Sequence, residues 1–224
     1  FLELEITAWL HSPERRRQLE AEEYYDGDQA VLRRRRLALD DDGNLVELSH
    51  LPNHRMVDNQ YAKMVDQKTN YSFGRPFSFD TENAQYAEAL NTILGARFRR
   101  LLRAVGEGAW ISGKCWLCPR YEGGELTFQR LPADEVLPFW ADADHTILDA
   151  AVHLYAVQEY DETEQVRQVV KVEVMHGGGV DCFVRKDDGI LVPDDYALSG
   201  PYITERDPVT GDERGYNWSR VPLV

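Results

Sequence analysis

The spacing of apolar side chains changes part-way along the chain, and this change constrains the fold more than any other feature. Up to Gly106 the apolar residues recur with the 3.6-residue period of a helix, and after it they alternate with the two-residue period of a strand. No helix-length segment separates the later strand-like runs, so parallel crossover connections have no room. The sequence therefore predicts an α+β fold, with N-terminal helices in residues 1–105 packed on an antiparallel β-sheet in residues 106–224.

Three helices are expected in the first half. Ser12 is a suitable N-cap, Pro13 suits the first helical position, and Gly27 should end or kink this helix. The second helix has an apolar face over residues 57–68. The third covers about residues 83–105, and the arginines expected near its end would complement the helix dipole.

Antiparallel strands are expected in the second half. Residues 110–117 and 125–131 flank a glycine turn at 122–124, a pattern that predicts a hairpin. Three more alternating runs predict three further strands. These strands span residues 151–160, 165–176 and 180–186, with turns at 161–163 and 177–179.

Net charge narrows the range of functions. The chain carries 25 Lys and Arg against 39 Asp and Glu, a formal charge of −14. Most of the acidic excess lies after residue 110, which disfavours tight wrapping of duplex DNA, because each phosphate contact needs a local cation. No apolar run approaches the roughly 20 residues that cross a bilayer, so no membrane partner is expected.

The pair Cys115 and Cys118 has the spacing of half a structural zinc site. The other half is missing, because Cys182 stands alone and the six histidines are scattered without paired spacing. A redox motif is also disfavoured, since Pro119 follows where a helix should begin. Half-buried strand cysteines are the preferred interpretation, and no metal ligand is assigned.

Three consecutive aspartates, Asp40 to Asp42, invite comparison with a calcium-binding loop. Aligning Gly43 with the glycine of such a loop puts Ala38 at the first ligand position and Ser49 at the last, where a bidentate Glu is required. Both positions fail the pattern. The segment is expected to be a solvated turn between two short extended pieces.

Catalytic motifs are not found either. The chain lacks a G-x-S-x-G elbow, a P-loop, a dinucleotide-binding glycine motif and an H-E-x-x-H helix. Asp134–Glu135 and Asp142–His145 could form an acid–base set, but they lie in a proline-rich connecting segment that reads better as a loop. No catalytic or cofactor-binding residue is assigned, and no cofactor is expected.

Five segments resemble portal proteins of tailed double-stranded-DNA bacteriophages, of the siphophage type. They are YYDGDQ at 24–29, LPNHRMVDNQYAKMVDQK at 51–68, AWISGK at 109–114, LPADEVLP at 131–138 and YNWSRVP at 216–222. They occur in the order of the family and span nearly all of the chain, which makes the likeness far more specific than one short motif.

The resemblance implies a structural subunit of a ring of about a dozen copies at one capsid vertex of the virion, used in DNA packaging and ejection. It implies no enzyme activity. The implied partners are other copies of the chain, capsid or scaffold protein, DNA passing through the channel, and terminase and tail adaptor through regions not in this chain. Assembly would take place in the cytoplasm of the bacterial host, for an active phage or a prophage.

The matching part resembles the peripheral wing of the family. Residues 1–105 would be its mainly helical part and residues 106–224 its antiparallel β part, while stem, clip and crown are absent. The chain is therefore expected to be a piece of a longer protein. Its negative charge would let packaged DNA pass without adhering.

Two other functions stay open at this stage. One is a phage-encoded metal-dependent or nucleic-acid-processing enzyme with Cys115, Cys118 and Asp142–His145 as its site. The other is a scaffold-like adaptor that binds through the arginine runs at 15–17 and 33–36. Consecutive helical residues advance about 100° each, so these runs would circle a helix and are expected to be solvated.

Overall fold

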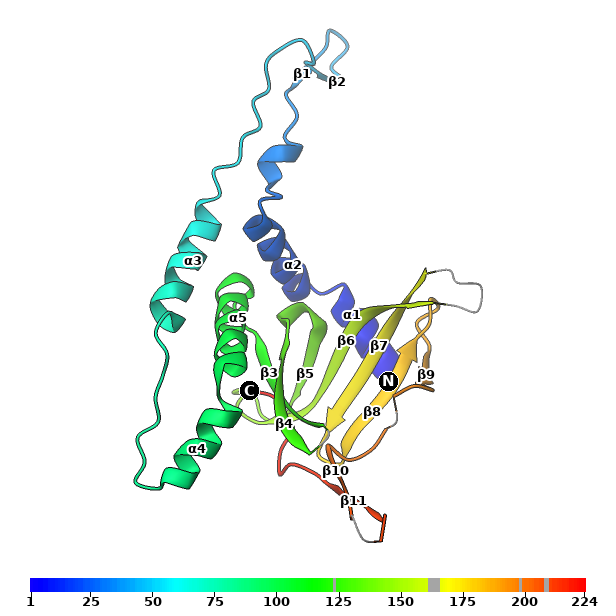
Figure 1. Cartoon of the computed structure of the whole chain (residues 1–224). Coiled ribbons are helices and arrows are strands. Elements are labelled where there is room, and N and C mark those ends of the chain that lie inside the picture. Colours follow the sequence, from blue (N-terminus) through cyan, green and yellow to red (C-terminus); the bar gives the residue numbers. More distant parts are fainter. Residues whose placement is uncertain (123, 161–165, 198, 208–209) are drawn as a thin grey trace.

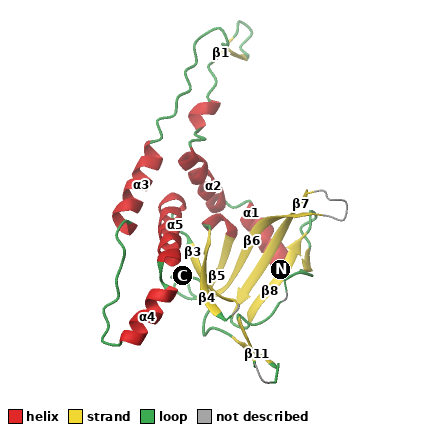
Figure 2. Ribbon diagram, in the orientation of Figure 1, coloured by secondary structure: helices red, strands yellow, loops and turns green. Residues whose placement is uncertain are grey.

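The chain forms a helical layer beside a five-stranded antiparallel sheet, with a long arm that extends away from both (Figures 1 and 2). The computed structural model describes residues 1–122, 124–160, 166–197, 199–207 and 210–224. The helices are α1 (Leu2–Leu10), α2 (Pro13–Asp26), η1 (Ala30–Arg33, 3-10), α3 (Gln60–Phe73), α4 (Ala84–Ile93), α5 (Ala96–Ser112) and η2 (Ala133–Glu135, 3-10). The predicted α+β class is confirmed.

Most strands belong to the second half of the chain. In order they are β1 (Leu37–Leu39), β2 (Leu45–Glu47), β3 (Trp116–Glu122), β4 (Glu125–Leu131), β5 (Val136–Trp140), β6 (Leu148–Tyr160), β7 (Val166–His176), β8 (Gly179–Arg185), β9 (Leu191–Pro193), β10 (Ile203–Arg206) and β11 (Glu213–Tyr216). The main sheet has the order β5-β6-β7-β8-β9, and the pairs β1-β2, β3-β4 and β10-β11 are separate antiparallel hairpins.

The predicted caps of the first long helix are confirmed. The Ser12 side chain accepts a hydrogen bond from the Arg15 backbone N–H at 3.2 Å, and Pro13 is the first helical residue. Gly27 ends the helix with φ of 93°, a left-handed conformation that glycine adopts without steric cost. One helix was not predicted: α1 is short, and Ile6 is its one buried residue.

The expected third helix was wrong in its extent. It is two helices, α4 and α5, and α5 continues through Gly106 to Ser112. Its arginines therefore lie in the first half of α5, so the expected complement to the dipole at the helix end is also wrong.

Trp110 was expected to be a core residue of a strand, but it lies on α5 and is 43% exposed. Lys68 Nζ lies 4.5 Å from the centroid of its ring.

Tertiary packing explains why α5 tolerates Gly106. Helices α3 and α5 pack together, and a Cβ atom at position 106 would overlap the ring of Phe73 at the end of α3. The close approach of the two helices outweighs the helix-breaking tendency of a glycine, which is about 1 kcal/mol relative to alanine. A glycine that reads as a helix stop in the sequence is thus a packing position.

The predicted hairpin and the three predicted strands are confirmed as β3-β4 and β6, β7 and β8, although β3 begins at Trp116 rather than at residue 110. The turn predicted at 161–163, and Gly123 in the turn at 122–124, lie outside the described residues. Strand β5 was wrongly expected to be a loop because it contains Pro138. An edge strand accepts a proline, and β5 is the edge strand beside β6.

Alternation along β6 divides the core between the two faces of the sheet. Val152 and Leu154 face one side, where Ile6 of α1 packs against them and is fully buried. Ala151 faces the other side, where it joins the core cluster of the β3-β4 hairpin. That cluster contains Trp116, Cys118, Leu131, Val136, Ala151, Met175, Val221 and Leu223.

We predict that Gly106→Ala destabilises the chain by about 1–3 kcal/mol, because the added methyl group overpacks the contact with Phe73. The change should appear as a lower midpoint of urea denaturation. Gly177→Ala is the matched control, since nothing lies within 4 Å of a Cβ there. Equal midpoints for the two variants would contradict the proposed packing role of Gly106.

Candidate interaction surfaces

A half-buried ionic cluster joins the β3-β4 hairpin to the main sheet. Arg120 on β3 forms an ion pair with Glu173 on β7, whose Oε2 atom also lies 3.4 Å from His153 Nδ1 on β6. His153 Nε2 lies 3.3 Å from Oε2 of Glu135 in η2. Tyr155 donates to Glu173 Oε1 at 3.4 Å and stacks on the His153 ring. Strand alternation brings these groups together, because 153 and 155 share the face that carries Ala151.

The charges of this cluster support one another. Burial alone would raise the pKa of Glu173, but His153 and Arg120 hold it at about 2. Burial would likewise lower the pKa of His153, but its contacts with Glu135 and Glu173 raise it above 6.5. Both carboxylate oxygens of Glu173 are occupied by protein groups. The cluster therefore serves as a structural connection between two layers.

We predict that His153→Gln reduces the pH dependence of stability. A raised pKa in the folded state means that protonated His153 stabilises the fold below about pH 6.5, and that this contribution is lost as the pH rises through the folded pKa. The free energy of unfolding of the unsubstituted chain should fall as the pH rises from about 6 to about 9, and that of the variant should fall less. Urea denaturation at several pH values measures the free energy of unfolding of both proteins. If it changes equally with pH in the two, this role of His153 is contradicted.

The Cys115–Cys118 pair, which has the spacing of half a zinc site, is not assembled into a metal site in the part of the chain that the structure describes. Cys118 is buried on β3, Cys182 is buried on β8, and Cys115 is half-buried before β3, where its thiol donates to the Leu131 carbonyl oxygen at 3.5 Å. Burial raises the pKa of Cys118 to about 11. No group of three His, Cys, Asp or Glu side chains with metal-binding geometry occurs among the described residues.

The two acidic pairs considered as an acid–base set have separate structural roles. The Asp134 backbone carbonyl accepts a hydrogen bond from Arg15 Nε at 2.9 Å, and Glu135 belongs to the ionic cluster. Asp142 caps its own turn by accepting from the backbone N–H groups of Thr146 and Ile147 at 3.0 and 2.7 Å. His145 stacks on Trp140 with ring centroids 5.1 Å apart.

The arginine runs are only partly solvated. Arg15 contacts Asp134 and lies over the Trp9 ring at 5.2 Å, so the first run contributes an anchor between α1, α2 and η2. Arg33 pairs with Asp28 at 2.6 Å and Glu23 at 3.3 Å. Arg34 and Arg35 are exposed, as predicted.

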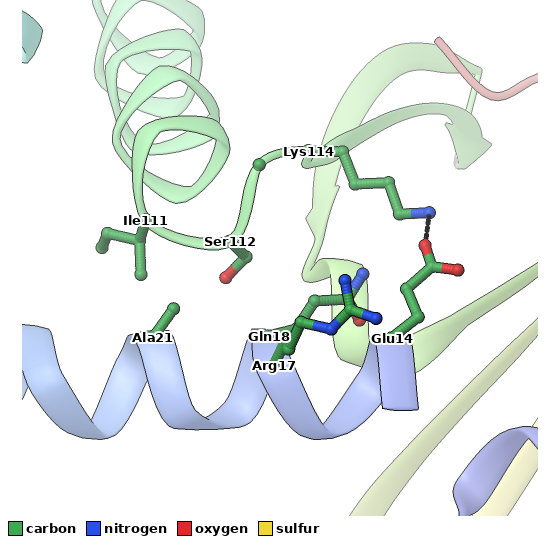
Figure 3. Close-up of a pocket in the computed structure, with 8 residues that line it drawn as sticks. Glu14, Arg17, Gln18, Ala21, Ile111, Ser112 and Lys114 are labelled. Atoms are coloured by element: carbon green, nitrogen blue, oxygen red, sulfur yellow. Dashed lines mark hydrogen bonds and ion pairs between the residues drawn. The ribbon is translucent and has the colours of Figure 1, made fainter. Parts of the chain in front are cut away.

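A small polar pocket lies between α2 and the end of α5 (Figure 3). Its volume is about 430 Å³, and Lys114 Nζ forms an ion pair with Glu14 Oε1 across its rim at 2.5 Å. Gln18 is 5% exposed, and its Oε1 atom has no hydrogen-bond partner among the described residues. The lining residues are Glu14, Arg17, Gln18, Ala21, Ile111, Ser112, Gly113 and Lys114.

A larger and more apolar cleft of about 650 Å³ lies at the other end of α5, between the α4-α5 junction and the tip of the β3-β4 hairpin. We call it the hairpin cleft. Its lining includes Ile93, Phe98, Leu101, Tyr121, Leu126 and Phe128, together with Arg97 and Glu125. Ile93 is 40% exposed, so part of this apolar surface is open to a partner.

Residues 29–59 form the arm, which extends from α2 and α3 away from the sheet (Figure 1). Hydrogen bonds across its two limbs hold it in shape: Arg36 Nη1 donates to the Pro52 carbonyl at 3.1 Å, and Asn53 Nδ2 donates to the Arg34 carbonyl at 3.0 Å. At the base, Asn59 Nδ2 donates to the Tyr25 carbonyl at 2.7 Å. All residues of the arm are described, and none of them is buried.

Comparison with known proteins identifies the family. A family model described as phage portal protein, SPP1 Gp6-like, matches residues 10–224. The chain belongs to this portal family. It is 24% identical over 218 residues to a portal protein of Bacillus phage SPP1, covering 96% of this chain and 41% of that protein. It is 26% identical over 180 residues to a portal protein of Clostridium phage phiCD119, covering 75% of this chain and 39% of that protein.

The resemblance to phage portal proteins drawn from the sequence is thereby confirmed, and the portal family is a structural one. The chain spans about two fifths of the length of the curated portal proteins that it matches. The described helices include none that is long and apolar enough to span a membrane. Sequence reasoning missed the ionic cluster and the hairpin cleft, because both gather residues that are far apart in the chain.

Proposed function

We propose that this chain is the wing part of a phage portal subunit, a head-to-tail connector at one vertex of the capsid. The family match over residues 10–224 carries the proposal. The whole protein would close into a ring of about twelve copies, used in packaging and ejection of DNA. Residues 1–105 would form the mainly helical part of the wing and residues 106–224 its β part.

The partners follow from that role. The wing would contact neighbouring copies and capsid or scaffold protein, while terminase and tail adaptor would bind other regions of the whole protein. DNA would pass through the channel with few contacts, in keeping with the formal charge of −14. The particle would assemble in the cytoplasm of the bacterial host and stay in the virion, whether the phage is active or a prophage.

We further propose that the chain has no catalytic function of its own and uses no cofactor. The ionic cluster supports this view, because its charged groups are committed to each other and to the connection between hairpin and sheet. The best-formed surfaces are a projecting arm and an open apolar cleft, and such features suit association with other chains.

Native mass spectrometry of the full-length protein tests the proposed ring. We expect a closed assembly of about a dozen copies, because ring formation requires every subunit to meet two neighbours through the same pair of surfaces. Residues 1–224 alone should be monomeric or weakly associated. A full-length protein that stays monomeric at high concentration would contradict the proposal, and so would stoichiometric zinc retained after dialysis together with turnover of a nucleic acid.

A further inference from the structure

The hairpin at the end of the arm has an apolar face that no described residue of its own subunit covers. Strands β1 and β2 pair Leu39 with Leu45 directly, and Leu37 lies on the same face two residues away. Leu39 and Leu45 are each 69% exposed and Leu37 is 48% exposed. A two-stranded hairpin is at best marginally stable in water, so such a face gains stability when another surface covers it.

The tip of the same hairpin is acidic. Asp40 uses its carboxylate inside the turn, accepting from the backbone N–H groups of Asp42 and Asn44 at 3.0 and 2.8 Å. Among the described residues, none donates a hydrogen bond or forms an ion pair with the carboxylates of Asp41 and Asp42. The arm therefore presents three exposed leucines with two available negative charges beside them.

The hairpin cleft offers the complementary properties at the opposite end of the helical layer. Its floor is apolar, and Arg97 lines it, with Arg100 exposed on the next turn of α5. Neither guanidinium has an acidic partner among the described residues. Both cations lie in the first two turns of α5, where the helix dipole is also positive, so this end of the cleft attracts carboxylates. Glu125, on the opposite wall of the cleft, offsets this positive charge only in part.

We propose that the arm hairpin of one copy docks in the hairpin cleft of a second copy of this chain. Leu39 and Leu45 would cover the apolar lining, and Asp41 and Asp42 would face Arg97 and Arg100. This inference rests on the proposed ring, and it names the surfaces through which neighbouring wings meet.

The placement of the two surfaces favours a neighbour over the chain itself. The arm extends beyond α2 and α3, and the α4-α5 junction lies at the end of α5 away from it, so the arm hairpin is remote from the cleft of its own chain (Figure 1). Two different, complementary patches form a head-to-tail contact, and repetition of such a contact closes a ring when the rotation between copies permits it. Charge pairs at the rim would fix the register of docking more than its strength.

Cysteine cross-linking in the full-length protein tests the contact. The double variant Leu45→Cys/Ile93→Cys is treated with a short bismaleimide after native mass spectrometry has confirmed the ring. We expect a ladder of covalent multimers in a denaturing gel, because each interface then joins one arm to one cleft. Each single variant adds one thiol per interface to the native Cys115, Cys118 and Cys182 and should give no ladder. Leu45→Cys/Ile190→Cys places the second added thiol on the exposed β8-β9 turn as a matched control.

The outcomes separate this inference from the proposed function. A ring that forms but gives no ladder would overturn the docking of the arm and leave the ring intact. Failure of the unsubstituted protein to form any ring would overturn the proposed function, and the docking with it. A ladder that is equally strong in the control with Ile190→Cys would also overturn the assignment of the cleft.

A charge exchange provides an independent test. Asp41→Lys/Asp42→Lys should raise the concentration at which full-length rings dissociate by about 3- to 10-fold, since each exposed ion pair contributes little and the variant replaces two of them with like charges. Adding Arg97→Glu/Arg100→Glu should restore assembly. Asp187→Lys/Asp188→Lys changes the net charge by the same amount, but on the β8-β9 turn. It should have no comparable effect on ring dissociation. If the aspartate variant loses assembly and adding Arg97→Glu/Arg100→Glu fails to restore it, the proposed pairing is contradicted.

Discussion

The pairing of β6 with β7 supports the rest of the structure. These are the two longest strands, and their register is continuous from Ala150 opposite His176 to Tyr160 opposite Val166. Because side chains alternate along a strand, this ladder sends Val152 and Leu154 to the face covered by α1 and sends Ala151 and His153 to the face covered by the β3-β4 hairpin. A shift by one residue would exchange the two cores and bury the wrong groups.

The hairpin face combines apolar packing with charge. Met175 and Ala151 contribute to the core beneath β3, and the ion pair of Arg120 with Glu173 lies next to this core. A half-buried ion pair of this kind is costly to break on one side, because the remaining charge is left without a partner. Helix α5 packs against β4 of the hairpin and against α2 and α3, and the arm, which has no buried residue, extends from these two helices.

Local chemistry made much of the fold predictable from the sequence. Ser12, Pro13 and Gly27 specify the ends of α2, and alternation specifies β6, β7 and β8, because these signals act over a few neighbouring residues. What the sequence could not show depends on contacts between distant elements: Gly106 reads as a helix stop until the Phe73 ring is placed beside it. The same holds for the candidate surfaces, since the ionic cluster draws on β3, β6, β7 and η2, and the hairpin cleft joins α5 to β4.

Membership of the portal family supports the proposed role, in which the chain meets other chains through its outer surfaces. The most direct test is a cryo-electron-microscopy reconstruction of the full-length protein. We predict a closed ring with the five-stranded sheet away from the channel and every arm seated on the adjacent subunit. A reconstruction that shows isolated monomers, an open filament, or this sheet lining the channel would contradict that role.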